Sequence, residues 1–114
     1  MFTLDQARAE LAALRVRIDD FLILRADLAE LRADLHRGGG NLADAKALEA
    51  RLYAELESFA GTGAQVKGWA PLLFDWPGEF LDVPVLWCWL EGEPDIAWYH
   101  RLDCGFPGRR RIGP

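Results

Sequence analysis

The stretch Val83–Arg109, VPVLWCWLEGEPDIAWYHRLDCGFPGR, decides the fold of the C-terminal half of this chain. It holds two apolar runs, Val83–Leu90 and Asp95–Leu102, on either side of one turn. Both runs are rich in aromatic and β-branched residues, so we predict two β-strands that form a hairpin. Three tryptophans and a tyrosine on two short strands have to be buried, and the hairpin is therefore predicted to belong to the core.

The turn Glu91–Pro94 sets the predicted register of this hairpin. A glycine at its first central position suits a two-residue type II′ turn. In that register Trp87 lies opposite Trp98 and Val85 lies opposite His100, all on one face. The other face carries Leu86, Cys88, Ala97 and Tyr99. Both faces are largely apolar, so we expect each of them to be covered.

The N-terminal half has a helical period instead. Thr3–Gln6 has the form of a capping box, and apolar residues then recur every three or four positions without Gly or Pro until Gly38. We predict one helix over residues 4–36 and a second over 42–60, with Asn41 as its cap. Three glycines between them favour an antiparallel connection. The predicted fold class is α+β, with an antiparallel helical hairpin packed on a small antiparallel β-sheet.

The segment between the helices and the β-hairpin is harder to assign. Residues 64–67 are predicted as a short strand. The next apolar run, WAPLLFDWP at Trp69–Pro77, contains two prolines, so we predict an edge or irregular segment. A chain of 114 residues is long enough for one core. We therefore expect a single domain over 1–114, with the helical hairpin in 1–61 and the β-hairpin region and C-terminal tail in 62–114.

Two observations predict a homodimer. At about 1.5 Å per residue the first helix is roughly 50 Å long and the second roughly 28 Å, so the second covers the first only back to about residue 18. The apolar stripe Leu4–Leu14 then needs another partner, which is the sheet or a second copy. The hairpin also has two apolar faces, whereas one chain offers a single helical layer. Coiled-coil contacts between copies, or a different protein partner, would meet the same need.

Composition and charge narrow the class of protein. The net charge of −5 disfavours nucleic acid and anionic membranes as partners. The longest apolar run is far shorter than the roughly 20 residues that a membrane span needs. The N-terminus is acidic within five residues, and we expect no signal peptide there. Two cysteines do not make a disulfide framework, so a cytoplasmic location with reduced thiols is expected.

Six motifs stand in order along the chain: FTLDQAR at Phe2–Arg8, GGNLAD at Gly39–Asp44, QVKG at Gln65–Gly68, LLFDWP at Leu72–Pro77, LWCWLEGEPDIAWYH at Leu86–His100 and GFPGR at Gly105–Arg109. In this order they resemble a small family of uncharacterised bacterial proteins, catalogued as a domain of unknown function. Phe74 and Trp76 stand where the resemblance leads us to expect Val and Phe, and both keep the hydrophobic character. The resemblance supports the fold and implies no activity.

Three polar residues are the candidates for acid–base chemistry: Asp75, His100 and Asp103. Asp75 and His100 are the one acid–imidazole pair that we expect could share a pocket. In the simpler alternative Asp75 accepts backbone amides before Pro77, and His100 is a buried strand residue with one hydrogen bond. His100-x-x-Asp103-Cys104 holds too few nitrogen and sulfur ligands for a zinc site, so we expect neither a metal nor a cofactor.

The candidates for ligand binding are Trp69, Trp76, Trp98 and Arg109. Arg109 could anchor an anionic group, although the acidic run before it favours an internal ion pair. Cys88 is expected to be a small buried hydrophobe. The sequence shows no catalytic motif, so we favour a non-catalytic, homodimeric interaction or structural protein and do not expect an enzyme. The alternative is a small-molecule-binding or hydrolytic protein with a pocket around Asp75, His100 and Arg109.

Overall fold

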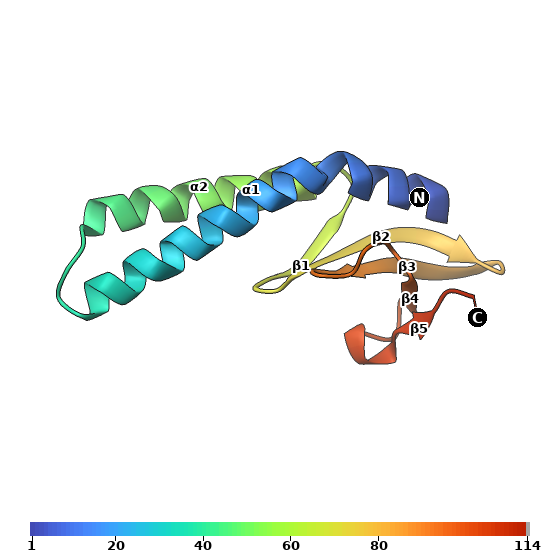
Figure 1. Ribbon diagram of the computed structural model, residues 1–114. Coiled ribbons are helices and arrows are strands. Elements are labelled where there is room, and N and C mark those ends of the chain that lie inside the picture. Colours follow the sequence, from blue (N-terminus) through green and yellow to red (C-terminus); the bar gives the residue numbers. More distant parts are fainter. Residues whose placement is uncertain (114) are drawn as a thin grey trace. The chain divides into compact units, whose positions relative to one another are not determined.

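The computed structural model describes residues 1–113 of the chain. Two helices, α1 (Leu4–His36) and α2 (Leu42–Ala60), precede five strands and a short 3₁₀ helix (Figure 1). The α+β prediction is thereby confirmed. The chain divides into two compact units, one formed by residues 1–13 together with the chain from Phe59 onward, and one formed by Leu14–Ser58. The prediction of a single domain stays a prediction, and its expected boundary at residue 61 differs from the division between the units.

Both helices begin and end where the sequence predicts. The Gln6 amide donates to Thr3 Oγ1 at 3.1 Å and the Thr3 amide donates to Gln6 Oε1 at 2.9 Å, which is the reciprocal pattern of a capping box. Asn41 Oδ1 accepts the amide of Ala43 at 2.8 Å and so caps α2. Local capping groups therefore define where both helices begin.

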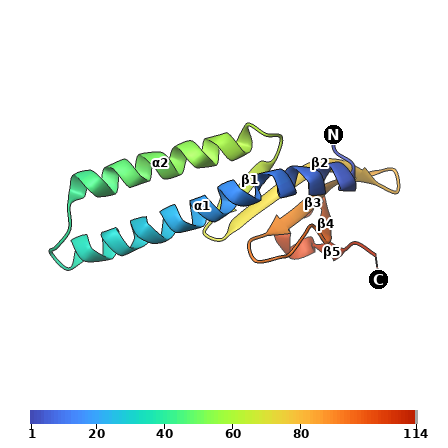
Figure 2. The ribbon, with the colours of Figure 1, turned by 45° about the horizontal axis from the view of Figure 1, so that its top comes forward.

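The unit Leu14–Ser58 is an antiparallel helical hairpin (Figure 2). Its apolar side chains are buried along the line where the helices meet: Leu14, Ile18, Phe21, Leu24, Leu28, Ala45 and Leu52. Arg32 of α1 donates to Glu49 of α2 at 2.7 Å, and this hydrogen bond lowers the pKa of Glu49. Among the described residues, no helix combines the length and the apolar character that a membrane crossing requires.

The other unit contains a five-stranded antiparallel sheet in the order β1-β2-β3-β4-β5. The strands are β1 (Gln65–Trp69), β2 (Leu72–Phe80), β3 (Val83–Leu90), β4 (Trp98–Arg101) and β5 (Arg110–Arg111). The prediction of an edge or irregular segment at Trp69–Pro77 was wrong, because β2 pairs on both sides. Pro71 precedes the strand, and β1 pairs with β2 only as far as Asp75, so Pro77 lies beyond the doubly paired part.

The predicted register of the hairpin was wrong by one residue. Trp87 pairs with Tyr99, Cys88 with Trp98, and Leu86 with His100. The Glu93 amide donates to the Leu90 carbonyl at 3.0 Å and closes a turn, but residues 91–97 continue as a loop and Asp95–Ala97 is not strand. This longer connection moves Trp98 and His100 to the face that carries Cys88.

The sheet is covered on both faces by its own unit. On one side lie the first turns of α1, where Ala7 and Leu11 are buried, and on the other lies the 3₁₀ helix (Phe106–Gly108) (Figure 1). Arg8 of α1 donates twice to the Ile96 carbonyl, at 3.0 and 2.8 Å. Aromatic rings fill the α1 side, where Phe74 contacts Phe59, Trp76 and Trp89 at centroid distances of 5.3, 5.9 and 5.5 Å.

These observations remove the two reasons that led us to predict a homodimer. Leu11, Leu14 and Leu86 are 1, 3 and 7% exposed in a single chain, so neither the helix stripe nor the second sheet face needs a partner copy. The oligomeric state itself stays a prediction.

The aromatic layer should carry much of the stability of the sheet. Trp89 is 1% exposed and Trp69 is 39% exposed. Trp89→Ala leaves a large cavity, so we expect a loss of about 3–5 kcal/mol in the free energy of unfolding. Trp69→Ala is the matched control, with an expected loss below about 1 kcal/mol. Urea denaturation of both variants measures the difference, and equal losses would contradict the assignment of Trp89 to the core.

Candidate functional site

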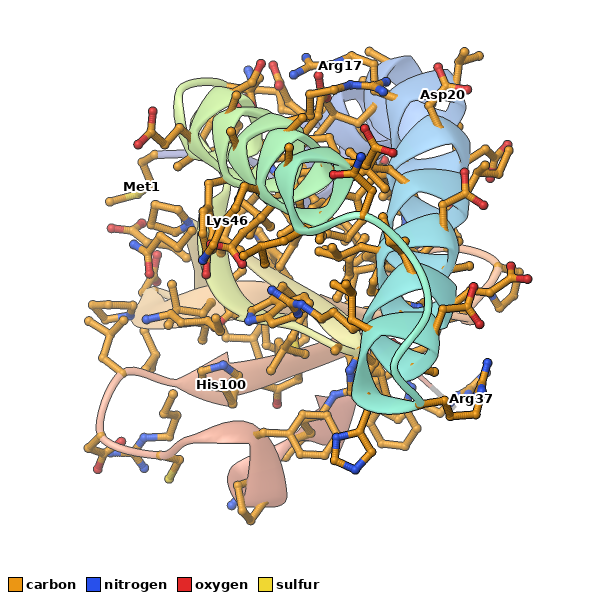
Figure 3. The ribbon with its side chains drawn as sticks, turned by 90° about the vertical axis from the view of Figure 1, so that its left-hand side faces the viewer. Met1, Arg17, Asp20, Arg37, Lys46 and His100 are labelled. Carbon is orange, nitrogen blue, oxygen red and sulfur yellow. The ribbon has the colours of Figure 1, made fainter. Side chains whose placement is uncertain are left out.

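Asp75 and His100 meet on the sheet face that is turned away from α1. Asp75 lies in the middle of β2. His100 lies on β4 and is labelled in Figure 3. The two residues are 2 and 5% exposed, and a hydrogen bond of 3.0 Å joins Asp75 Oδ2 and His100 Nε2. The sequence singled out this acid–imidazole pair, and the structure brings its two members into contact. The expected position of His100 beside Trp87 was wrong, because of the register.

The two polar contacts of His100 limit where protons can lie in this pair. Its Nδ1 lies 3.1 Å from the backbone carbonyl oxygen of Arg101, and its Nε2 faces the Asp75 carboxylate. Both neighbours are acceptors, whereas a neutral imidazole has a single N–H. With a proton on Nδ1, the contact between Nε2 and Asp75 needs one further proton, on the ring or on the carboxyl group. A cation between His100 Nε2 and the Asp75 carboxylate would make the same contact favourable.

Cys88 is the third member of the cluster. It lies on β3 directly opposite Asp75 and is fully buried. One ligand atom each from Asp75, Cys88 and His100 lie within 4.8 Å of one another. Burial, and after it the Asp75 carboxylate, raise the pKa of the Cys88 thiol to about 12. Sequence reasoning missed this residue because, without β2 as a paired strand, nothing placed Cys88 beside Asp75.

One oxygen of the cluster lacks a partner. Asp75 Oδ1 is buried and accepts no hydrogen bond from the described residues. Burying a carboxylate oxygen without a hydrogen-bond donor lowers the stability of the folded protein, so such atoms are rare in native structures. Asp75 therefore keeps one acceptor available to a ligand, a water molecule or an ion.

A pocket of about 330 Å³ lies between this sheet face and the loop that follows β4. Its walls combine polar and apolar side chains: Lys67, Leu73, Asp75, Leu86, His100, Leu102, Asp103, Cys104, Gly105 and Phe106. Asp103, the third candidate acid, thus lines the same pocket, but its Oδ1 lies 3.3 Å from Arg101 Nε in an exposed ion pair. The pocket gives the buried pair a route to solvent.

Arg109 has a structural partner. Its Nη2 donates to both carboxylate oxygens of Glu93, at 2.6 and 2.8 Å, and its guanidinium stacks on Trp98 and Phe106 at 4.9 and 4.8 Å from the ring centroids. The sequence favoured an internal ion pair for Arg109, and this is confirmed. Arg109 is not among the residues that line the 330 Å³ pocket.

The three candidate tryptophans lie in different places. Trp76 is fully buried on the α1 face, on the other side of the sheet from the pocket. Trp98 is half-buried on the face of Asp75, beneath Arg109. Trp69 lines a second, more apolar cavity of about 590 Å³, which shares Leu73 and Phe106 with the first. Of the three, Trp69 is the one that borders an open cavity next to the acid–imidazole pair.

The two cysteines should differ sharply in reactivity. Both are free, with Cys88 buried and Cys104 exposed. A thiol with a pKa of about 12 is ionised in only about one molecule in 10,000 at pH 8, and the thiolate is the reactive form. We therefore expect a chromogenic disulfide reagent to titrate one thiol in the native chain and two in urea, with Cys104→Ser abolishing the native signal. Equal native reactivity of both thiols would contradict the buried position of Cys88.

The chain was compared with known proteins at the level of family, curated sequence and solved structure. No curated protein and no solved structure matches it. One family model does match, and it covers residues 1–112, which is nearly the whole chain. The family resemblance inferred from the motifs is thereby confirmed. The chain belongs to DUF2203, a family described as an uncharacterised conserved protein.

Proposed function

We propose that this protein binds a small polar molecule in the pocket above Asp75 and His100, and that the buried pair acts on it as a hydrolytic acid–base centre. The observation that carries the proposal is the 3.0 Å contact between Asp75 and His100 at the wall of a 330 Å³ pocket. Pockets of this size, lined by apolar side chains with a few convergent polar groups, are typical of small-molecule sites.

The walls of the pocket favour an amphipathic ligand. Asp75, His100, Asp103 and Lys67 supply polar groups at one end. Leu73 and Phe106 lead into the neighbouring cavity of about 590 Å³, where Trp69, Pro71 and Leu90 supply apolar surface. A ligand with a polar group over Asp75 and an apolar part over Trp69 would use both cavities.

The hydrogen bonds divide the roles within the pair. Both ring nitrogens of His100 are engaged, whereas Asp75 Oδ1 has no partner among the described residues. In this proposal Asp75 Oδ1 accepts the proton of a water or ligand hydroxyl, which is the task of a general base. His100 is then a positioning residue that fixes the carboxylate and its charge.

The chain offers a matched test, because it has two histidines. His36 is exposed at the end of α1, and His100 is buried at the pocket. We expect a thermal-shift screen of small carboxylic acids, amines, nucleotides and esters, performed in a chelator, to find a compound that raises the melting temperature. A ligand at 100 times its Kd stabilises by about 2.7 kcal/mol, enough for a shift of several degrees.

His100→Gln and Asp75→Asn should abolish this shift, and His36→Gln should leave it unchanged. Ester or phosphate hydrolysis, if the screen compound is hydrolysable, should follow the same pattern. A shift that survives Asp75→Asn and His100→Gln would place the binding site elsewhere and contradict the proposal.

A second candidate, a homodimer formed through α1, is favoured by a separate observation. Val16 and Ile23 are 73 and 62% exposed and stand seven positions apart, which is one heptad on a helix. Ile23 also lines a groove of about 450 Å³ within the helical hairpin. Two copies paired along this line would bury both side chains in a coiled-coil contact.

Light scattering at micromolar concentration should then give about twice the 12.8 kDa mass of one chain. Ile23→Lys should return the mass to that of a monomer, because a lysine ammonium is costly to bury at such a contact. Leu81→Lys is the control, since Leu81 is 82% exposed in the turn after β2. A wild-type mass near 13 kDa would exclude the dimer under these conditions.

The cellular setting of both candidates is also part of the proposal. We propose a cytoplasmic location, because Cys88 and Cys104 are free thiols and the chain has no other cysteine. The net charge of −5 argues against nucleic acid as a partner.

A further inference from the structure

We infer that Asp75, Cys88 and His100 form a binding site for a divalent transition-metal ion, with Zn²⁺ as the best match. The inference rests on the proposed function in one respect, since the pocket supplies the ion with a route from solvent and a place for a ligand. It differs from the sequence expectation of no metal, which counted only donors that are close together along the chain.

The three donors come from three adjacent strands at one level of the sheet. Asp75 and Cys88 are direct partners across β2 and β3, and His100 pairs with Leu86, two residues from Cys88 on the same face. Their ligand atoms lie within 4.8 Å of one another, and the carboxylate and imidazole atoms are 3.0 Å apart. Zinc bonds of about 2.0–2.3 Å in tetrahedral geometry place ligand atoms roughly 3.3–3.6 Å apart. The cluster is therefore close to the spacing that the ion requires.

The backbone orients the imidazole for coordination. In the tautomer with its proton on Nδ1, His100 would donate to the Arg101 carbonyl oxygen, 3.1 Å away, and would present the lone pair of Nε2 to the cluster. Ligating histidines in metal sites are held in the same way, by a hydrogen bond from the second ring nitrogen.

A second, independent observation points to a missing partner. Asp75 is 2% exposed, and its Oδ1 has no hydrogen-bond partner among the described residues. A divalent ion would satisfy this carboxylate. With one carboxylate, one thiolate and one neutral imidazole, the charges of the buried site would sum to zero, which removes the cost of an isolated charge.

The donor set selects the kind of metal. Thiolate and imidazole ligands favour zinc and its soft neighbours, whereas Mg²⁺ and Ca²⁺ prefer sites made only of oxygen. Three protein donors leave one position of a tetrahedral ion unfilled, as in catalytic rather than structural zinc sites. Because Asp75 and His100 line the pocket, that position would be open to a ligand or a water molecule from the pocket.

Cobalt(II) is the probe for this site, because a cobalt–thiolate bond gives a charge-transfer band in the near ultraviolet. The decisive protein is the Cys104→Ser variant. Cys104 is exposed, so its replacement should leave the fold intact, and Cys88 is then the sole thiol of the chain. We expect this variant to bind one cobalt ion per chain, to show the thiolate band together with visible bands of tetrahedral intensity, and to lose both when Zn²⁺ is added.

Three further variants assign the ligands. Cys88→Ser should lose the charge-transfer band, and Asp75→Asn and His100→Gln should weaken Zn²⁺ binding by more than about 100-fold, beyond the usual effect of a residue that merely orients a ligand. His36→Gln should bind zinc as the wild type does. Absence of the thiolate band from folded Cys104→Ser protein would overturn the inference, whether or not the other variants fold.

The inference and the proposed function can fail separately. Zinc binding with this pattern, but without any response in the small-molecule screen, would retain the metal site and remove the hydrolytic pocket. A small-molecule response in chelator that depends on His100, without a cobalt–thiolate band, would retain the pocket and remove the metal. A cobalt band that is present in the wild type and lost in Cys104→Ser would assign metal binding to the exposed loop and so overturn the inference.

Discussion

The pairing of β2 with β3 is the constraint on which the sheet and its candidate site both depend. It places Phe74 and Trp76 opposite Trp89 and Trp87, and it places Asp75 opposite Cys88. Because side chains alternate along a strand, one register sends the aromatic rings to the α1 face and the polar donors to the other. A slip of one residue in β2 would bury Asp75 in the aromatic layer, and a slip of one residue in β3 would move Cys88 to that layer instead.

The parts of the fold that sequence could predict are those with local causes. The ends of α1 and α2 follow from side chains that cap the helix a few residues away, such as Thr3 and Asn41, and from the glycine run between the helices. The register between β3 and β4 has a non-local cause. Gly92 does adopt a positive φ of 97°, as a turn requires, but the loop continues to Ala97. Within this loop Ile96 is fully buried, and its carbonyl oxygen accepts two hydrogen bonds from the Arg8 side chain. No local pattern distinguishes that loop from a two-residue turn.

The candidate site was predictable in its members and not in its geometry. Asp75 and His100 could be named because Asp75 stands between two aromatic residues and His100 is the one histidine after residue 61, and Arg109 could be expected to pair with an acid. Only the strand pairing places Cys88 in the site, and sequence alone could not single out Glu93 from the six acidic residues between Lys67 and Arg101. Spacing along the chain carries no information on donors that meet across three strands. For that reason a motif search for metal ligands fails on this sequence even where the fold brings such ligands together.

The short C-terminal strand has a consequence for access to the buried face. β5 is only two residues long, and the segment around it is fastened by the Ile112 amide on the Ala97 carbonyl at 2.9 Å and by Arg109 on Glu93 and Trp98. Segments held by so few ladder hydrogen bonds open locally at free energies well below that of global unfolding. Amide protons of β4 and β5 are thus set to exchange with deuterated solvent ahead of those in β2 and β3. Each such opening would loosen the edge of the sheet next to β4 while the β2–β3 ladder stays intact, so the exchange rate of a few C-terminal amides measures how often this edge opens.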